Sequence, residues 1–207
     1  MLKVAVLLSG GGTTLENIFT HIDAGKLDAQ VVCVVSSRRD AYGIVRAQNH
    51  GVPASVVARK DYGDSVTFSD AVWTEIRKFD VDLVVLAGFM SLLTIPPDFV
   101  NRVVNTHPAL IPAFCGHGMY GHHVYEAVLA KGAKITGVTI HFADNLYDHG
   151  PIIAQESVSV LEDDTVDTLS ARVQAKEREV YVKAIQLIAE GRVQVEGQRT
   201  RILPPRD

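Results

Sequence analysis

The chain has 207 residues, of which 47% are apolar and 21% charged, proportions that are ordinary for a soluble globular protein. The formal net charge of -4 lacks the basic excess of a protein that binds nucleic acid through its phosphates. Cys33 and Cys115 are far apart, which suits a reducing cytosol and not a disulfide scaffold. The apolar run at residues 2–8 leads directly into glycines and is too short for a signal peptide or membrane span. We expect one cytoplasmic domain over residues 1–207, without nucleic-acid or membrane partners.

Strand-like and helical patterns alternate through the first half of the chain. Apolar, β-branched runs predict strands at residues 2–8, 30–35, 54–57 and 81–87. Apolar residues at helical spacing predict helices from residue 14, over 41–49 and over 65–79. This alternation predicts an α/β fold whose central sheet is doubly wound and mostly parallel in the first half.

The second half has a different rhythm. Its predicted elements are a strand at 103–107, a helix at 122–130, strands at 134–142 and 152–160, and a long helix at 165–189. The polar turn 143–150 is short enough to make only an antiparallel hairpin, so the sheet becomes mixed. Asp164 is placed to cap the long C-terminal helix and Gly191 to end it. The polar tail 192–207 is expected to lie on the surface.

Asn105 and His107 lie at the end of the predicted strand 103–107. Side chains alternate along a strand, so this pair projects to one side, and Pro108 ends the strand there. Ligands of open α/β sheets bind at the carboxyl ends of strands. An amide that donates to an oxyanion, beside an imidazole that moves a proton, suits an acyl-type reaction. The alternative is a strand end whose polar side chains satisfy nearby backbone groups.

Glycines at positions 10, 11 and 12 lie between the first strand and the first helix, where backbone N–H groups favour an anion. Leu15 stands where a dinucleotide fingerprint has its third glycine, and no Walker lysine follows. The pattern therefore indicates a loop for one phosphate group, assisted by the hydroxyl groups of Thr13 and Thr14. The alternative is a tight turn that requires glycine for its geometry alone.

Two carboxylates stand out in the second half. Asp148 ends the polar turn and is placed to orient His107, or to relay its proton, if the hairpin end folds back toward residues 105–107. Alternatively, Asp148 is an ordinary turn former. Glu177 interrupts the apolar stripe of the long helix, where a carboxylate needs a partner or a cleft. Pairing with a Lys or Arg is the alternative for Glu177.

Several histidines invite a metal interpretation that the spacing does not favour. His122 and His123 are adjacent, and adjacent side chains on a helix point about 100° apart. Neither they nor His117 are accompanied by a thiolate pair or a His-Glu-x-x-His motif, so we expect no metal. His141 has the strand parity to line the same pocket as Asp148, or is packed.

Taken together, these motifs resemble those of the phosphoribosylglycinamide formyltransferase family of folate-dependent enzymes. The matching positions are residues 9–13, 86–90, 105–112, 141–142, 148–153, 172–174 and Glu177. They occur in the family's order and cover nearly the whole chain. Two features depart from the family pattern: Ser91 stands where Arg is usual, and the loop 113–123 is longer and richer in Gly and His.

The resemblance implies an enzyme that transfers the formyl group of 10-formyltetrahydrofolate to the amine of glycinamide ribonucleotide, through a tetrahedral intermediate, in purine (IMP) biosynthesis. It implies that the catalytic residues are Asn105, His107 and Asp148. The ribonucleotide is expected to contact Gly11, Gly12, Thr13, Thr14 and Glu177. The folate co-substrate is expected to contact Phe89, Met90, Ser91, Leu92, Leu93, His141 and Asp144. The resemblance leaves a monomer or a homodimer open.

Related activities are less compatible with this chain. A methionyl-tRNA formyltransferase needs an added C-terminal tRNA-binding domain, for which 207 residues are expected to leave no room. A formyltetrahydrofolate hydrolase usually carries an N-terminal regulatory domain, whereas the first strand here is expected to start at residue 2. The alternatives that we retain are a hydrolase-like enzyme and a non-catalytic phosphosugar-binding module.

Overall fold

The computed structural model describes residues 1–205, which divide into two compact units between Val104 and Asn105. Strands and helices alternate through the first unit, as the sequence predicts. They are β1 (Leu2–Leu8), α1 (Thr13–Asp23), β2 (Ala29–Ser36), α2 (Gly43–Asn49), β3 (Ala54–Val56), α3 (Ser65–Ile76) and β4 (Leu83–Leu86), with short 3-10 turns η1 (Arg59–Asp61) and η2 (Pro97–Phe99).

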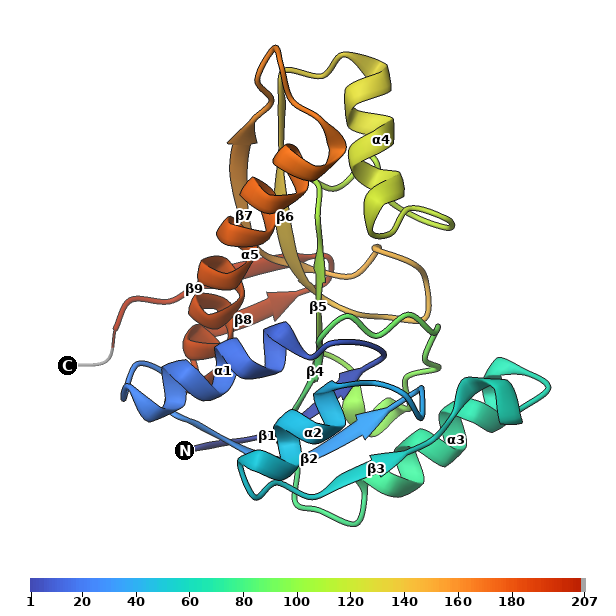
Figure 1. Ribbon diagram of the computed structural model, residues 1–207. Helices are drawn as coiled ribbons and strands as arrows, with labels where there is room; N and C mark the ends of the chain where they lie inside the picture. Colours follow the sequence, from blue (N-terminus) through green and yellow to red (C-terminus); the bar gives the residue numbers. More distant parts are fainter. Residues whose placement is uncertain (206–207) are drawn as a thin grey trace. The chain divides into compact units, whose positions relative to one another are not determined.

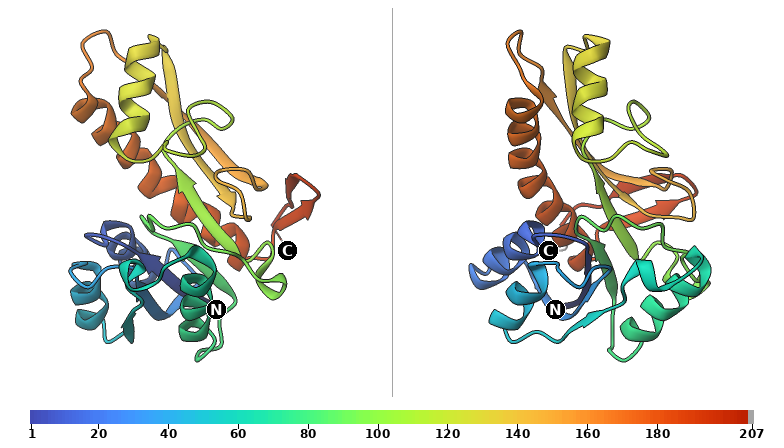
Figure 2. Two further views of the ribbon diagram at one scale, coloured as in Figure 1. Left: turned by 90° about the vertical axis from the view of Figure 1, so that its right-hand side faces the viewer. Right: turned by 45° about the vertical axis from the view of Figure 1, so that its right-hand side comes forward.

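The sheet of the first unit is parallel. β1 pairs with β2 and β4, and β2 pairs with β3. Figures 1 and 2 show α1 and α2 together on one face of this sheet and α3 on the other. Because helices cover both faces, the central strand β1 is buried from Val4 to Leu8. α3 ends at Ile76, three residues before the predicted end, and β4 is shorter than the predicted strand 81–87.

The second unit contains most of β5 and all later elements. They are β5 (Val103–His107), α4 (His122–Lys131), β6 (Ile135–Phe142), β7 (Ile152–Ser159), α5 (Val166–Ala189), β8 (Val193–Glu196) and β9 (Arg199–Ile202). β6 and β7 pair in antiparallel fashion, which confirms the predicted hairpin. α5 packs against β6, β7 and α4. Tyr125, Leu169 and Val173 are buried together between the two helices.

The strands follow the order β3-β2-β1-β4-β5-β6-β7 in one sheet. Val103 and Val104 of β5 pair in parallel with Val84 and Val85 of β4. The predicted fold class is therefore confirmed: the sheet is mostly parallel, carries an antiparallel hairpin in the second half, and is accompanied by a long C-terminal helix. None of the helices in residues 1–205 has a stretch both apolar and long enough to traverse a bilayer.

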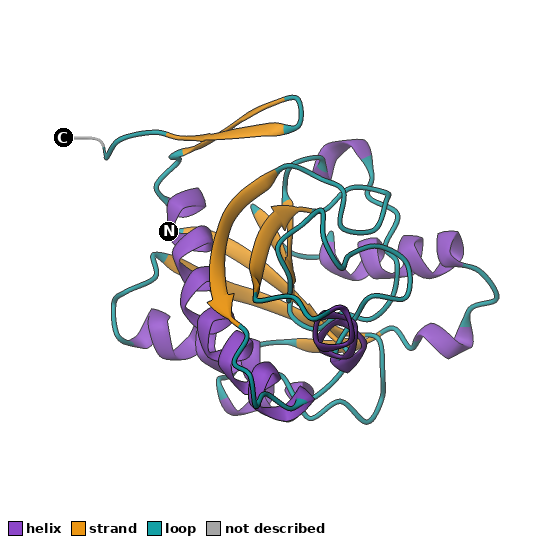
Figure 3. Cartoon of the chain, turned by 90° about the horizontal axis from the view of Figure 1, so that it is seen from above, coloured by secondary structure: helices purple, strands orange, loops and turns teal. Residues whose placement is uncertain are grey.

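The C-terminal segment is largely exposed, as predicted, and contains two strands that the sequence did not predict. β8 and β9 form an antiparallel two-stranded sheet of their own, visible in Figure 3 beside the C-terminus. The hydroxyl of Thr200 in β9 donates to the carbonyl of Ile152, which attaches this hairpin to β7. Arg206 and Asp207, also part of the predicted tail, lie outside the described residues.

The start of α5 corrects the predicted cap. The N-cap is Thr165, whose hydroxyl accepts the N–H of Thr168 while the Thr168 hydroxyl accepts the N–H of Thr165, a reciprocal capping box. Asp164 instead accepts hydrogen bonds from Arg172 and from the N–H of Leu161. Arg172 therefore holds the pKa of Asp164 well below its usual range. The helix ends at Ala189, and Gly191 follows in the left-handed conformation.

Candidate active site

β5 delivers an imidazole to a buried position in the second unit. Val103 and Val104, at the start of the strand, are buried. Pro108 has no N–H with which to continue the hydrogen bonds of the strand, so the strand ends at His107, which is 3% exposed. The Nε2–H of His107 donates to the carbonyl of Phe114 over 2.8 Å. Because Nε2 keeps its hydrogen in that bond, Nδ1 is the ring nitrogen that takes up a proton when the imidazolium forms.

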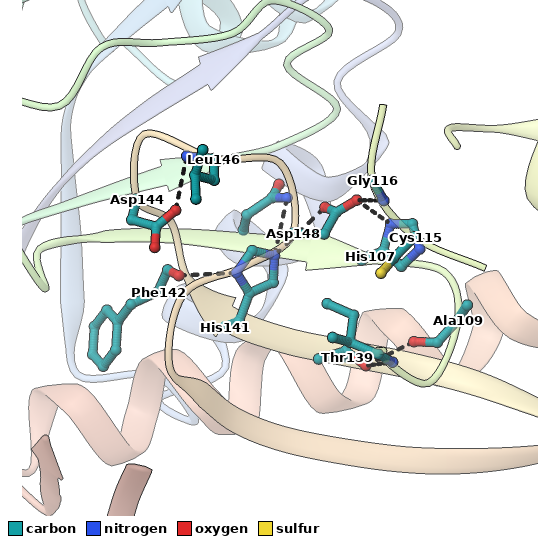
Figure 4. A network of polar contacts seen from close by, with 12 residues as sticks. His107, Ala109, Cys115, Gly116, Thr139, His141, Phe142, Asp144, Leu146 and Asp148 are labelled. Atoms are coloured by element: carbon teal, nitrogen blue, oxygen red, sulfur yellow. Dashed lines mark hydrogen bonds and ion pairs between the residues drawn. The ribbon is translucent and has the colours of Figure 1, made fainter. Parts of the chain in front are cut away.

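Asp148 faces His107 Nδ1. One oxygen of Asp148, Oδ2, lies 3.4 Å from that nitrogen and accepts the N–H of Gly116 over 2.9 Å. Its side chain is 9% exposed, so the carboxylate does not point into bulk water. Figure 4 shows that the turn carrying Asp148 folds back to the end of β5, the condition on which the predicted pairing depended. A carboxylate at this position stabilises an imidazolium at Nδ1.

A second imidazole fixes the orientation of Asn105. The Nδ1–H of His141 donates to the Phe142 carbonyl over 2.9 Å, and burial lowers the pKa of His141, which favours the neutral ring. Its Nε2 is therefore an acceptor, and it lies 3.4 Å from Nδ2 of Asn105. This contact identifies the Asn105 atom beside His141 as the NH2 group, which keeps a second hydrogen for another acceptor. Oδ1 of Asp148 lies 3.8 Å from the same His141 nitrogen.

Backbone groups that the sequence did not predict complete the cluster. The Phe114 carbonyl and the Gly116 N–H both come from the loop 113–123, whose purpose the sequence left open. Phe114 (φ 51°) and Asp148 (φ 52°) both adopt the left-handed conformation. This conformation is costly for a bulky residue such as Phe, and such strain concentrates at functional sites. The glycines of the loop were the only sequence signal of an unusual backbone there.

Thr139 supports the segment that follows His107. Its hydroxyl donates to the Ala109 carbonyl over 2.7 Å and accepts the N–H of Ile111 over 3.1 Å. The side chain of Gln155, from the paired strand β7, donates to Thr139 Oγ1 and to the Ile111 carbonyl. These contacts hold the chain just beyond β5 against the β6–β7 hairpin, and the sequence reasoning did not identify either side chain.

The remaining polar residues of this region lie outside the His107–Asp148 pair. Asp144 is on the same turn as Asp148, but its carboxylate pairs with His149 over 2.7 Å. His117 packs edge-on against Tyr147, and His123 pairs with Glu126. Within residues 1–205, no group of three or more His, Cys, Asp or Glu side chains is arranged to hold a metal ion.

Glu177 projects from α5 next to Tyr125 of α4. Burial raises the pKa of Glu177 to about 7, and the positive charge of Arg178 offsets only part of this effect. The charge of Glu177 acts in turn on Tyr125, whose buried hydroxyl is hydrogen-bonded to Ser170. A half-buried carboxylate that is costly to ionise is suited to accepting hydrogen bonds from a ligand hydroxyl group.

The first unit holds the predicted phosphate loop. Gly12 adopts the left-handed conformation (φ 72°) and is the N-cap of α1, which then begins at Thr13. Thr13 is exposed and Thr14 half-buried, so the first turn of the helix is open to a ligand. Gly11 is also exposed. An exposed helix N-terminus with glycine backbone N–H groups can bind one phosphate.

The segment 89–93 follows β4 in the same unit. Phe89 stacks on Phe68, and the N–H of Met90 donates to the hydroxyl of Ser9 over 2.9 Å. The Met90 residue is 58% exposed, whereas Leu93 is buried. Ser91 and Leu92 are half-buried. This segment therefore offers apolar surface without any charged side chain.

Comparison with known proteins places these features in context. The model of the family described as "Formyl transferase" matches residues 2–185. A phosphoribosylglycinamide formyltransferase of Haemophilus influenzae is 34% identical, with 94% of this chain and 91% of that protein aligned. A chloroplastic phosphoribosylglycinamide formyltransferase of Arabidopsis thaliana is 38% identical over 92% of this chain, which spans only 66% of that protein's length.

A solved structure agrees with these relatives. The crystal structure of glycinamide ribonucleotide transformylase 1 from Symbiobacterium toebii superimposes with a TM-score of 0.90 and is 40% identical in sequence. The superposition covers 99% of this chain and 95% of that one. The similarity therefore extends over both compact units and not over a single shared motif.

Proposed function

Because the chain belongs to the formyl transferase family, we propose that it transfers the formyl group of 10-formyltetrahydrofolate to the amine of glycinamide ribonucleotide in purine biosynthesis. The observation that supports this proposal most directly is the buried pair of His107 and Asp148 beside the oriented amide of Asn105. These are the groups that acyl transfer to an amine requires: an oxyanion donor and a proton carrier.

The proposed reaction begins when the substrate amine attacks the formyl carbon and a new C–N bond forms. The formyl oxygen becomes an oxyanion, to which Asn105 donates the Nδ2 hydrogen that His141 does not engage. His107 accepts the amine proton at Nδ1, and Asp148 stabilises the resulting imidazolium. The bond from carbon to N10 of the folate then breaks, and N10 takes the proton, so that one proton moves from amine to leaving nitrogen.

We assign the binding roles residue by residue. The glycine loop, through Gly11, Gly12, Thr13 and Thr14, binds the ribonucleotide phosphate, and Glu177 accepts hydrogen bonds from the ribose hydroxyls. The folate contacts the segment 89–93 together with His141, near the end of β6, and Asp144, in the turn that follows β6. The apolar side chains at 89–93 fit a flat heterocycle, and Ser91 leaves backbone groups to make the polar contacts.

The proposal extends to the domain organisation of the chain and to its cellular compartment. Because the family match runs from residue 2 to residue 185, we infer that the two compact units function as one formyltransferase domain. Cys33 and Cys115 are both free thiols, which suits the reducing cytoplasm. The ligands we assign are the two small molecules; a monomer and a homodimer are both compatible with the proposed site.

A turnover assay tests the function. Incubation with 10-formyltetrahydrofolate and glycinamide ribonucleotide should consume the formyl donor, and omission of the ribonucleotide should stop the consumption. His107→Ala should lower kcat by about 100-fold, the usual scale for a lost acid–base group. Consumption that continues without the ribonucleotide would instead identify a hydrolase, and no consumption under any condition would identify a non-catalytic phosphosugar-binding module.

A further inference from the structure

α2 contacts the glycine loop closely within the first unit. A Cβ atom built on Gly12 would lie 2.6 Å from the Cα of Gly43, and one built on Gly43 would lie 2.4 Å from the side chain of Leu8. Gly12 therefore requires glycine, because it meets the backbone of Gly43 at the first turn of α2; a Cβ on Gly43 would lie 3.2 Å from the Cα of Gly12. This contact brings α2 side chains within reach of the loop carbonyls.

Two donors from α2 engage successive carbonyls of the loop. The N–H of Gly43 donates to the carbonyl of Gly10 over 3.1 Å, and Nε of Arg46 donates to the carbonyl of Gly11 over 2.9 Å. In a planar trans peptide the C=O and the following N–H point in opposite directions. The N–H groups of Gly11 and Gly12 are therefore both turned away from α2, toward the same side of the loop.

Neither of these two N–H groups has an acceptor within the described part of the chain; Gly11 is exposed and Gly12 is buried. Successive backbone N–H groups that point to one side form a concave anion site. The Gly11 carbonyl, which lies in the same peptide plane as the Gly12 N–H, is held by the side chain of Arg46.

Arg46 is itself held in place on several sides. Its guanidinium lies over the ring of Tyr42 at 5.3 Å and donates to Glu16 over 2.8 Å. Glu16 is in the first turn of α1, so this ion pair holds the guanidinium against the start of that helix. The side chain of Arg46 is 27% exposed, and its Nε is committed to the Gly11 carbonyl.

We propose that Arg46 is a positioning residue for the ribonucleotide phosphate: its Nε–H fixes the Gly11–Gly12 peptide so that the Gly12 N–H is aimed at the anion. This inference rests on the proposed function of the glycine loop. It assigns Arg46 no direct contact with the phosphate, and it makes the donor at the Nε position, and not the positive charge, the essential feature.

A matched pair of variants separates the donor from the charge. Arg46→Gln places an amide N–H at the position of Nε, whereas Arg46→Met has a chain of similar length without a donor; both lose the charge and the ion pair with Glu16. We expect Arg46→Met to raise the KM for the ribonucleotide about 10-fold, the scale of one lost hydrogen bond to a charged group, with kcat and the KM for the folate little changed. For Arg46→Gln, the KM for the ribonucleotide should stay within about threefold of that of the parent protein. Arg77→Ala, which removes an exposed ion pair with Asp98 in the same unit, is the control.

Direct binding of ribose 5-phosphate, measured by calorimetry, distinguishes this proposal from the proposed function. If the Met and Gln variants differ in binding ribose 5-phosphate but neither they nor the parent protein turns over, the positioning role stands and the formyltransferase assignment fails. If the parent protein turns over while the two variants share one KM and one affinity for ribose 5-phosphate, Arg46 does not position the loop. Equal thermal midpoints of the two variants verify that they differ only at the site.

Discussion

The carboxylate of Asp148 has two partners, the N–H of Gly116 and the imidazole of His107, and its position must suit both. Its Oδ2 accepts the Gly116 N–H, which anchors the loop 113–123, and faces His107 Nδ1, where the proton is proposed to reside. Its left-handed backbone turns the side chain toward both partners, at a conformational cost that Asp bears better than most residues. Anchoring requires only an oxygen acceptor at this position, whereas stabilising an imidazolium requires the negative charge.

Asp148→Asn separates these tasks. The amide oxygen of Asn still accepts the Gly116 N–H, so the loop and both KM values should change little. The lost charge should lower kcat by about 100-fold, because the proton carrier no longer has its counter-ion. Steady-state kinetics with both substrates measure the split, and Asp163→Asn, at an exposed position before α5, provides the control. A kcat within twofold of the parent value would remove Asp148 from the proposed proton path.

At the scale of the helices and strands, the start of α5 shows how two adjacent polar residues can have different roles in the fold. At the start of α5, Thr165→Ala removes one half of the capping box and should reduce the free energy of unfolding by about 1 kcal/mol. Asp164→Asn should cost more, because the Asp164 side chain is only 2% exposed and binds Arg172 through both oxygens. Urea unfolding measures which of the two variants loses more free energy of unfolding, with Lys183→Ala on the exposed side of α5 as control. The reverse order would mean that the capping box of Thr165 stabilises this junction more than the ion pair of Asp164 with Arg172 does.

The same junction explains what could be predicted from the sequence. Asp164 and Thr165 are both good N-cap residues, and nothing local decides between them; Arg172, two turns along the helix, engages Asp164 and leaves Thr165 to cap. The long strands and helices were predictable because their apolar periodicity is strong. β8 and β9 were missed because each is only four residues long and at least half of its residues are polar, so that both resemble a surface loop.

Some groups of the candidate site can be predicted from the sequence and others cannot. The spacing of Asn105 and His107 and the turn that carries Asp148 mark their side chains as candidates, since residue type and position carry the chemistry. The Phe114 carbonyl and the Gly116 N–H are backbone groups, which every residue possesses, so no sequence pattern identifies them. Thr139 and Arg46 act on the backbone of distant segments, and their contacts appear only when the chain is folded.

At the scale of the whole molecule, one titratable group links stability to pH. Burial raises the pKa of Glu177 from 4.5 to about 7 in the folded protein. Between these two values the folded state retains a proton that the unfolded chain has released, so this group makes the free energy of unfolding fall as pH rises through that window. The destabilisation caused by ionised Glu177 is therefore absent below pH 4.5 and complete above about pH 7.

Glu177→Gln should therefore gain stability over the parent protein as pH rises from 5 to 8. The shift of Glu177 corresponds to at most about 3 kcal/mol, with the partial exposure of the residue reducing this figure. Urea unfolding of both proteins at several pH values isolates the effect, since the other titrating groups are common to both. Glu179→Gln, an exposed carboxylate on the same helix, provides the comparison for the loss of one negative charge. A stability difference that is the same at pH 5 and pH 8 would mean that Glu177 is ionised throughout, and that the carboxylate proposed to bind the ribose hydroxyls is already compensated within the folded chain.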